Sequence, residues 1–286
     1  MDLAVKFVSR LTLLLLLGGF LAATLARTSP GYGVNEEELD TRLGADSIQA
    51  LRAEHAKTPG IAAFYCNYIA RLVRGDLGTS IALDEPIRNL IVERFPETFK
   101  SVALALILGW VAGLGLAAAS VMARSVWMDT GANLLAATVL CIPVAVLALF
   151  CAMTETPARL VIAIAVFPKV FKYARSILAR SFGLPHVLMA RAKGLGSWRI
   201  FLWHILPVAA PQLLALLAIS LSIAMAAAIP VESLCDIPGI GQLAWKAALS
   251  RDLELLVFLT TIVTFFTLLS NSSAELLGGL RRGGNA

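Results

Sequence analysis

The segment ARAKGLGSWRIFLWHILP, residues 190–207, stands out in a chain that is otherwise mostly apolar. It carries three basic residues, a histidine, two glycines and two tryptophans, and it contains no acidic residue. A basic segment of this kind between apolar stretches suits a lipid-headgroup collar, a nucleic-acid patch or a protein-docking surface. The sequence on either side of the segment decides which of these applies.

The composition on both sides indicates an integral membrane protein. Of the 286 residues, 58% are hydrophobic and 15% are charged, whereas a soluble domain has about 45–50% apolar and about 25% charged residues. The apolar residues form long blocks, and a membrane-spanning helix needs about 20 of them in a row. The sequence therefore predicts an all-α, polytopic transmembrane helix bundle.

Six apolar stretches predict about six spans. They are residues 5–26, 99–122, 131–153, 158–171, 208–229 and 253–269. The first also has features of a signal peptide, but its long apolar run favours a retained helix. The fourth contains Pro168 and Lys169 and is followed by Lys172, so it is the weakest of the six. Pro143 is expected to kink the third.

The remaining sequence divides the chain into three parts. Residues 1–26 form the N-terminal transmembrane helix, and residues 99–286 form a core of five spans. Residues 27–98 are polar and mixed in charge, with amphipathic pieces at 46–56 and 64–75. This middle part is predicted to be a helical extramembrane region on the periplasmic side.

The distribution of basic residues orients the bundle. Between residues 169 and 203 there are seven basic residues and no acidic one. Six spans place this stretch on the same side as both termini, and cytoplasmic loops are enriched in Lys and Arg. The segment of residues 190–207 and both termini are therefore predicted to be cytoplasmic. Counting residues 158–171 as a span depends mainly on this parity.

The chain lacks the motifs of the common catalytic and metal sites. It has no GxxxxGK[ST] phosphate-binding loop, no HExxH, no GxSxG and no Cys/His ligand spacing. No catalytic residue, metal site or cofactor is predicted, and the chain is not expected to be an enzyme. The spans have few ionisable groups, which argues against a carrier coupled to protons or sodium. A disulfide between Cys66 and Cys235 is left as an alternative to free thiols.

Local patterns predict a helical turn in the basic segment. Pro185 suits the first turn of a helix that stops at Gly194, and Gly196 and Ser197 can begin a second helix leading into the next span. Trp198 would suit an interfacial anchor. The residues alone support lipid anchoring and protein docking equally.

The same segment resembles the "EAA" loop of ATP-binding-cassette (ABC) importer permeases. Its spacing is similar to the family pattern G-x9-I-x-L-P, because Gly194 is followed by nine residues, His204, one further residue and then Leu206-Pro207. The form ARAKGL resembles the oligopeptide, dipeptide and nickel branch. The chain departs from the general pattern at two positions: Leu188 replaces the acidic residue and His204 replaces the isoleucine.

Three further elements resemble the same branch in family order. RTSPG at residues 27–31 is similar to its RxxPGD segment, and GDLGTS at residues 75–80 begins its element before the second span. VESLCDIPGIGQL at residues 231–243, followed by Arg251-Asp252, resembles its loop after the fifth span. The periplasmic motif residues singled out by this resemblance are Gly75, Asp76, Gly78, Ser80, Pro238, Gly239 and Gly241.

The resemblance implies a type I ABC-importer permease of the bacterial inner membrane. Such a permease pairs with a second, usually different, permease subunit, two ATPase subunits and a periplasmic solute-binding protein. The loop of residues 184–206 would couple to the ATPases, which hydrolyse the ATP. The residues carried over to this role are Ala190, Arg191, Ala192, Lys193, Gly194, Leu206 and Pro207. The solute itself stays open among peptides, nickel chelates and glutathione-like compounds.

Two other functions remain as alternatives. One is a membrane carrier that works without an ATPase, against which the scarcity of ionisable groups in the spans argues. The other is a membrane-anchored interaction protein whose basic loop binds lipid. Nucleic acid is not an expected partner, because the basic residues are interleaved with a helix-sized apolar face that suits a protein groove.

Overall fold

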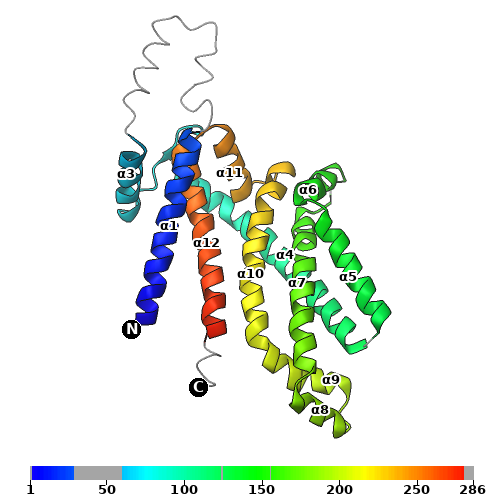
Figure 1. The fold of residues 1–286 in the computed structure, drawn as a ribbon. Helices are drawn as coiled ribbons and strands as arrows, with labels where there is room; N and C mark the ends of the chain where they lie inside the picture. The colour runs from blue at the N-terminus through cyan, green and yellow to red at the C-terminus, as the bar shows by residue number, and fades with distance from the viewer. Residues whose placement is uncertain (1, 29–59, 124, 155, 280–286) are drawn as a thin grey trace, which may run out of the picture. The chain divides into compact units, whose positions relative to one another are not determined.

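The protein is almost entirely helical in the computed structural model, which describes residues 2–28, 60–123, 125–154 and 156–279 (Figure 1). The helices before the bend at Pro143 are α1 (Asp2–Thr28), α3 (Ile61–Val73), α4 (Ile87–Ala123) and α5 (Val126–Cys141). Those after it are α6 (Val144–Met153), α7 (Ala158–Phe182), α8 (Pro185–Ala192), α9 (Ser197–Ile200), the π-helix η2 (Phe201–Ile205), α10 (Leu206–Leu234), α11 (Ile240–Leu249) and α12 (Leu253–Gly279). Two short strands, β1 (Thr79–Ser80) and β2 (Glu85–Pro86), pair antiparallel.

The predicted all-α class is confirmed, while the predicted number of spans is not. Among the described residues, three helices have the length and apolar composition of a membrane span: α4, the continuous stretch Ser197–Leu234, and Leu253–Ser272 of α12. Helices α5 and α6 add a fourth if they count as one span, but they are bent by 83° at their junction. The described apolar part of α1, Thr12–Leu25, is shorter.

The chain packs as two units, and each is described by itself. The first comprises residues Met1–Glu93 and Ala244–Thr264. In it, α3 lies beside α1 (Figure 1), as the amphipathic pattern of residues 64–75 predicts for a helix. The Tyr65 hydroxyl donates to the Leu16 carbonyl at 2.7 Å, and the Tyr65 ring meets Phe20 edge-on at 5.6 Å. RTSPG beyond Thr28 and the predicted helix at 46–56 lie outside the described residues.

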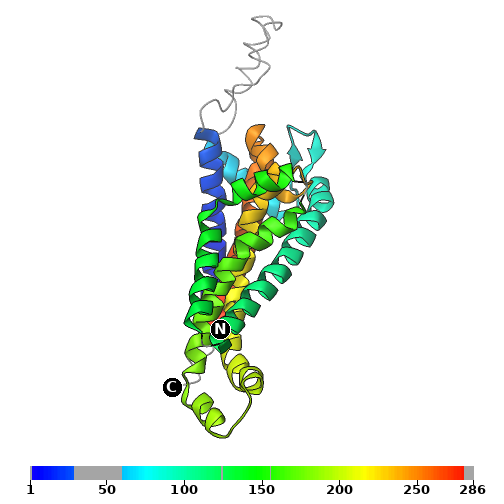
Figure 2. The same ribbon diagram turned by 90° about the vertical axis from the view of Figure 1, so that its right-hand side faces the viewer.

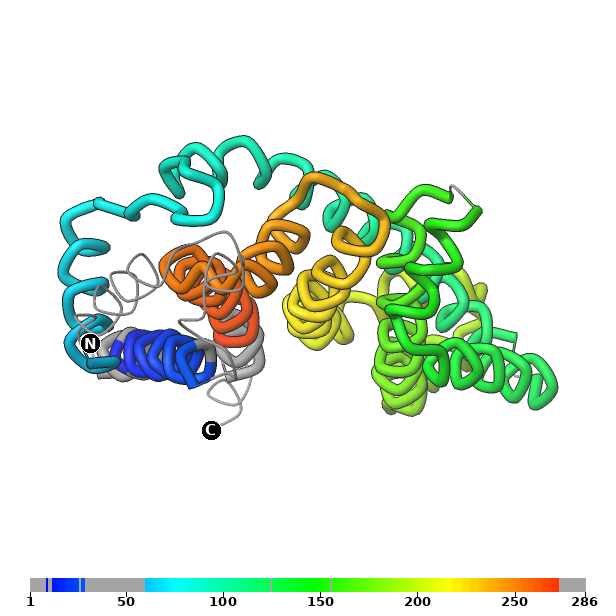
Figure 3. The backbone as a smooth tube through the Cα atoms, turned by 90° about the horizontal axis from the view of Figure 1, so that it is seen from above, coloured from blue at the N-terminus to red at the C-terminus, as the bar shows by residue number. Residues whose placement is uncertain are grey.

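The second unit comprises Arg94–Leu243 and Phe265–Ala286 and is built around α7. Helix α7 packs against α10, α5 and α6, and Figure 3 shows this group end-on. The side chains of Ile162, Val166, Phe171 and Leu178 are fully buried along it. The apolar stretch predicted as a span, residues 158–171, is the first part of a longer helix, because α7 continues without a break to Phe182.

Proline chemistry explains the sharp bend between α5 and α6. Helix α5 ends at Cys141, Ile142 is extended, and Pro143 becomes the N-cap of α6. Proline cannot donate the backbone hydrogen bond that would continue α5, and it disfavours the helical conformation of the residue before it. The expected kink at Pro143 is therefore present, and it divides the predicted span of residues 131–153 into two helices.

Helices α8 and α9 form a short turn beyond the end of α7. Figure 2 shows this turn at the end of the unit opposite to α6. From α9 the chain runs through η2 into α10 as one continuous helical stretch. The turn is thereby joined directly to the long apolar helix that packs against α7.

All four cysteines, Cys66, Cys141, Cys151 and Cys235, are free thiols in the structure. The alternative of a disulfide between Cys66 and Cys235 is therefore not adopted.

Candidate functional site

The basic segment folds as its local pattern predicts. Pro185 occupies the first turn of α8, and the chain reverses at Gly194, where φ is +75°. The Gly194 amide donates to the Arg191 carbonyl at 2.8 Å, and the Leu195 amide donates to the Ala190 carbonyl at 3.3 Å. These bonds satisfy the last carbonyls of α8 in the way that a glycine C-cap does.

The turn has a buried face and an exposed face. Val187, Ala190, Ile200, Phe201 and Ile205 are buried in the core cluster of the unit. The exposed face carries large apolar side chains beside small and basic ones. It comprises Leu188, Met189, Ala192, Lys193, Trp198, Arg199 and Trp203.

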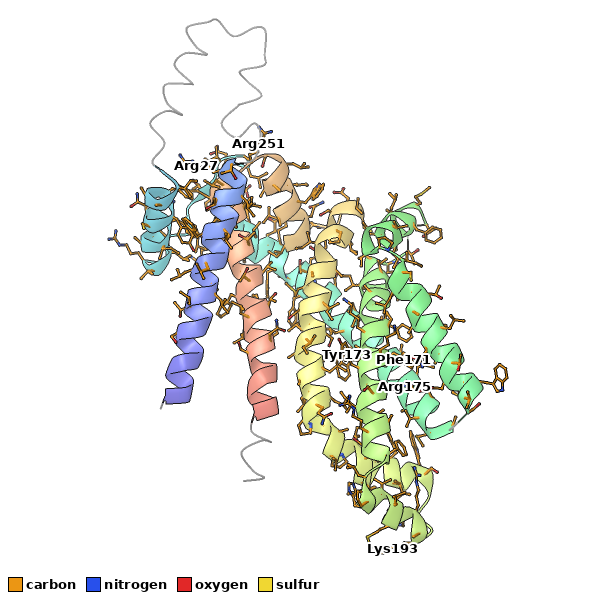
Figure 4. All side chains as sticks on the ribbon, in the orientation of Figure 1. Arg27, Phe171, Tyr173, Arg175, Lys193 and Arg251 are labelled. Atoms are coloured by element: carbon orange, nitrogen blue, oxygen red, sulfur yellow. The ribbon has the colours of Figure 1, made fainter. Side chains whose placement is uncertain are left out.

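This division separates the residues that were predicted to act together. Ala190 faces the interior, so it helps to pack α8 rather than to form the outer surface. Ala192 and Lys193 lie on the outside, and Lys193 stands at the tip of the turn (Figure 4). Leu206 is half-buried at the start of α10, while Pro207 beside it is exposed.

The positive charges of the turn have no acidic partner within the described part of the chain. The Arg191 guanidinium lies over the Phe182 ring at 5.4 Å, and Trp198 stacks on Phe201 at 5.6 Å. Neither Lys193 nor Arg199 forms an ion pair among the described residues. The turn therefore presents uncompensated positive charge beside exposed apolar side chains.

The π-helix at Phe201–Ile205 was missed by sequence reasoning. The sequence predicts one regular helix from Ser197, and no residue type in the stretch signals a wider turn. His204 lies in this π-helix, and its Nδ1 is buried without a hydrogen-bond partner. The His204 carbonyl lies 3.2 Å from the Nε2 atom of His186 on α8, so the π-helix also contacts the turn before it.

In the first unit, two motifs that are far apart in the sequence meet at Asp252. Its carboxylate accepts from the Ser80 hydroxyl at 2.6 Å and from the amides of Ala82 at 3.2 Å and Leu255 at 3.1 Å. Ser80 and Asp252 are both buried. The GDLGTS motif and the Arg251-Asp252 pair therefore form one structure, which sequence order alone does not reveal.

The other GDLGTS residues shape the approach to this carboxylate. Gly75 and Gly78 have φ angles of +80° and +78°, a region that favours glycine. The Asp76 carboxylate accepts from the Gly78 amide at 3.0 Å. A side chain at Gly78 would collide with Glu254, whose carboxylate accepts from Arg71 at 2.5 Å. This ion pair raises the pKa of the Arg71 guanidinium.

In the second unit, the PGIG loop is held by the buried carboxylate of Glu232. Its Oε2 accepts from the Gly241 amide at 2.7 Å and from the Thr98 hydroxyl at 3.1 Å. The Thr98 hydroxyl oxygen in turn accepts from the Ile240 amide at 2.8 Å. Gly239 and Gly241 pack so closely on Glu232 that neither position has room for a side chain, while Pro238 is exposed.

A further charged pair joins α5 to α7. Arg175 donates to both carboxylate oxygens of Asp129 through its Nε and one terminal nitrogen. Each side chain is 31% exposed. A bidentate pair of this kind fixes both the distance and the register of two helices. The sequence contains both residues, but their spacing along the chain does not predict the pairing.

The described residues contain no group of three or more His, Cys, Asp or Glu side chains that could hold a metal ion.

Comparison with known proteins identifies the family of this chain. Residues 101–280 match the sequence profile of the family described as "binding-protein-dependent transport system inner membrane component". The chain belongs to this family. It is thus a permease, an integral multi-pass component of the inner membrane, and it is not an enzyme, because separate subunits hydrolyse the ATP.

Named relatives resemble the permease over most of its length. The dipeptide transport system permease protein DppB of Bacillus subtilis is 25% identical, covering 91% of this chain and 90% of its own. The oligopeptide transport system permease protein OppB of Escherichia coli K12 is 24% identical over 84% of each chain. A putative peptide permease protein of Brucella suis is 24% identical, covering 88% of this chain and 85% of its own.

Proposed function

We propose that this permease imports peptides or a related small solute as one half of a translocation path. The other half would be a second permease subunit, with two ABC ATPase subunits on the cytoplasmic side and a solute-binding protein on the periplasmic side. Relatives whose names specify dipeptides and oligopeptides support the solute class. Both termini would be cytoplasmic, as the distribution of basic residues indicates.

The α8–α9 turn is the observation that carries this proposal. It exposes large apolar side chains and positive charges that form no ion pair within the described ranges. Its buried face is packed against α7 and leads directly into α10. Such a surface suits an apolar protein groove with acidic edges. A partner that binds the turn differently in two states would move α10 with it, which is what coupling to an ATPase requires.

The two motif loops suit the periplasmic side. Residues 27–98 would form a periplasmic region, and residues 99–286 the permease core. The carboxylates of Asp252 and Glu232 hold their loops in fixed conformations, so these loops would offer a preformed surface to a binding protein. Gly75, Asp76, Gly78, Ser80, Pro238, Gly239 and Gly241 would act by shaping these loops rather than by touching the solute.

Two glycines of the turn provide a matched test. Gly194 has a φ of +75°, whereas Gly196 has a φ of −63°, and an added Cβ would meet nothing within 4 Å at either position. Gly194→Val therefore distorts the turn without a collision, at about 1–2 kcal/mol, while Gly196→Val leaves the backbone relaxed. Membrane insertion, co-purification of the ATPase subunits and uptake of a radiolabelled dipeptide are measured for both variants.

We expect Gly194→Val to insert normally but to lose ATPase association or dipeptide uptake, while Gly196→Val keeps both. Normal uptake with an intact complex in Gly194→Val would overturn the coupling role of the turn. Uptake that persists without any ATPase subunit would instead favour a carrier. If Gly194→Val instead weakens only the contact of the turn with anionic lipid vesicles, and uptake is unaffected, the lipid-binding alternative would be favoured.

A further inference from the structure

One face of α7 is polar and basic from the middle of the helix to near its C-terminal end. It carries Lys169, Lys172, Tyr173, Ser176 and Arg180, which recur at helical spacing on a single side of the helix. Lys172, Tyr173 and Arg180 are exposed, and the other two are half-buried. The opposite face of the same turns is fully buried by Phe171, Ala174 and Leu178. Figure 4 marks Phe171 and Tyr173 on α7.

The continuous course of α7 places the two lysines near the middle of the helix. The helix runs from Ala158 to Phe182, which at 1.5 Å per residue is about 37 Å. Lys169 and Lys172 lie about 17 Å and 21 Å from its first residue, and the hydrocarbon core is about 30 Å thick. If α7 crosses the bilayer, both lysines therefore lie near its middle and not in the cytoplasmic stretch, whose five other basic residues between positions 175 and 199 still indicate the same orientation.

Charged side chains at this depth need water or a counter-charge. A lysine at the centre of a spanning helix is strongly disfavoured when it faces lipid. Neither lysine forms an ion pair with any described residue, and the Asp129 carboxylate on α5 is engaged by Arg175. A lysine side chain is too short to bring its ammonium group from mid-membrane to the lipid headgroups.

The two lysines and the neighbouring hydroxyls together make the face suitable for binding a carboxylate group. Side chains three residues apart on a helix have Cβ atoms about 5–6 Å apart, so the two ammonium groups can converge on one carboxylate. Tyr173 and Ser176 on the same face add neutral hydroxyl donors. A protonated amino group would be repelled by the same charges.

We propose that the α7 face of Lys169, Lys172 and Tyr173 lines the translocation path and binds the carboxylate group of the transported solute. This inference rests on the proposed import function and adds the chemical class of the group that α7 recognises. Two neighbouring lysines would attract an anionic group to mid-membrane, and their flexible side chains would let it leave again toward Arg180 at the far end of the same face.

Cysteine accessibility tests the proposal in the assembled importer reconstituted in liposomes. K172C is compared with I164C, since Ile164 is 41% exposed on the same helix but lies off the polar face. Two thiosulfonate reagents, one bearing a sulfonate and one a trimethylammonium group, label each variant, with the unsubstituted chain as background for its four cysteines. We expect both reagents to label K172C, the sulfonate severalfold faster, and neither to label I164C.

The remaining lysine provides the control for charge. K169Q added to K172C should remove the preference for the sulfonate reagent without removing labelling. Three results would overturn the proposal. The first is that both reagents label K172C at equal rates while Lys169 is still present, the second is that I164C is labelled as well as K172C, and the third is that K172C is not labelled at all. The last result would place the face against lipid or against an acidic side chain of the second permease.

Transport provides the second measurement. K169Q/K172Q should lower the uptake of radiolabelled dialanine severalfold, and K169E/K172E should lower it further, while the ATPase subunits still co-purify. Unchanged uptake in K169Q/K172Q would also overturn the proposal. Failure of the unsubstituted chain to associate with ATPase subunits would instead contradict the proposed import function, so the two failures are distinguishable.

Discussion

The two loops that flank α10 each contain a pair of closely spaced glycines, and they use them in opposite ways. Before the helix, Gly194 and Gly196 are surrounded by open space, and no acidic side chain is present. After the helix, Gly239 and Gly241 are pressed against the carboxylate of Glu232. The first loop is shaped so that its outer surface stays free, and the second so that the loop stays fixed. A glycine motif therefore does not by itself identify a contact surface.

The largest expected loss of stability comes from a substitution that disrupts the tightly packed loop after α10. Gly241→Val would bring its Cβ within about 2.6 Å of the Ile229 Cα atom and 3.0 Å of the Ala228 carbonyl, both backbone atoms that cannot move aside. We expect destabilisation of about 3 kcal/mol or more. Thermal unfolding of the purified permease in detergent, followed by tryptophan fluorescence, measures the change.

The control for Gly241→Val is Gly115→Val in α4, where an added Cβ meets nothing within 4 Å. This control should change the midpoint of unfolding little. Equal midpoints for the two variants would show that the loop after α10 is not tightly packed, and the contrast between the two loops would fail.

The next largest effect concerns the carboxylate that holds the same loop. Glu232→Ala leaves the Gly241 amide and the Thr98 hydroxyl without their buried acceptor, at a cost of about 1–3 kcal/mol. Glu232→Gln keeps an acceptor oxygen at nearly the same position, so it should lower the free energy of unfolding clearly less than Glu232→Ala does. Unfolding midpoints of the two variants measure the difference. If the glutamine variant is as unstable as the alanine variant, the charge of Glu232 matters more than its hydrogen bonds.

A smaller effect is expected at the ion pair between α5 and α7. Because Asp129 and Arg175 are each 31% exposed, solvent weakens the pair, and Asp129→Ala should cost about 1–2 kcal/mol. Replacing both residues by leucine and methionine should recover most of that loss. A double-mutant cycle of unfolding free energies measures the coupling. Purely additive effects would mean that the pair does not hold the two helices together.

The smallest effect is expected on the open loop. Trp203 is 75% exposed, so Trp203→Ala should change the free energy of unfolding by less than about 0.5 kcal/mol. Ile205, two residues later, is fully buried, and Ile205→Ala should cost about 2–5 kcal/mol. Unfolding midpoints of the two variants check this. A marked loss of stability in Trp203→Ala would mean that the outer face of the turn packs inside this chain.

The sequence predicts those parts of the fold that depend on composition and local backbone chemistry. Long apolar runs identify α4, α10 and α12, Pro185 and Gly194 bound the turn correctly, and Pro143 marks the bend. These predictions are correct because each feature depends on only a few neighbouring residues.

The misjudged parts depend on tertiary packing. The apolar stretch of the fourth predicted span stops at residue 171, yet α7 continues to Phe182 with Ala174 and Leu178 buried on one face. The partners Ser80 and Asp252 are 172 residues apart, and nothing local predicts which carboxylate a serine will find. Ala190 looked like part of an outer surface because small residues suit close contact, but that contact is with its own core.

The continuous helical stretch from Ser197 to Leu234 can transmit a displacement of the turn to the loop at its other end. Its 38 residues correspond to about 57 Å of helix, with α9 at one end and Glu232 near the other. At that length, a sideways displacement of about 3 Å at Ser197 corresponds to a tilt of only about 3°. A small displacement of the turn would thereby tilt the stretch as a whole, and the π-helix and the internal prolines Pro211 and Pro230 are the places where it would bend.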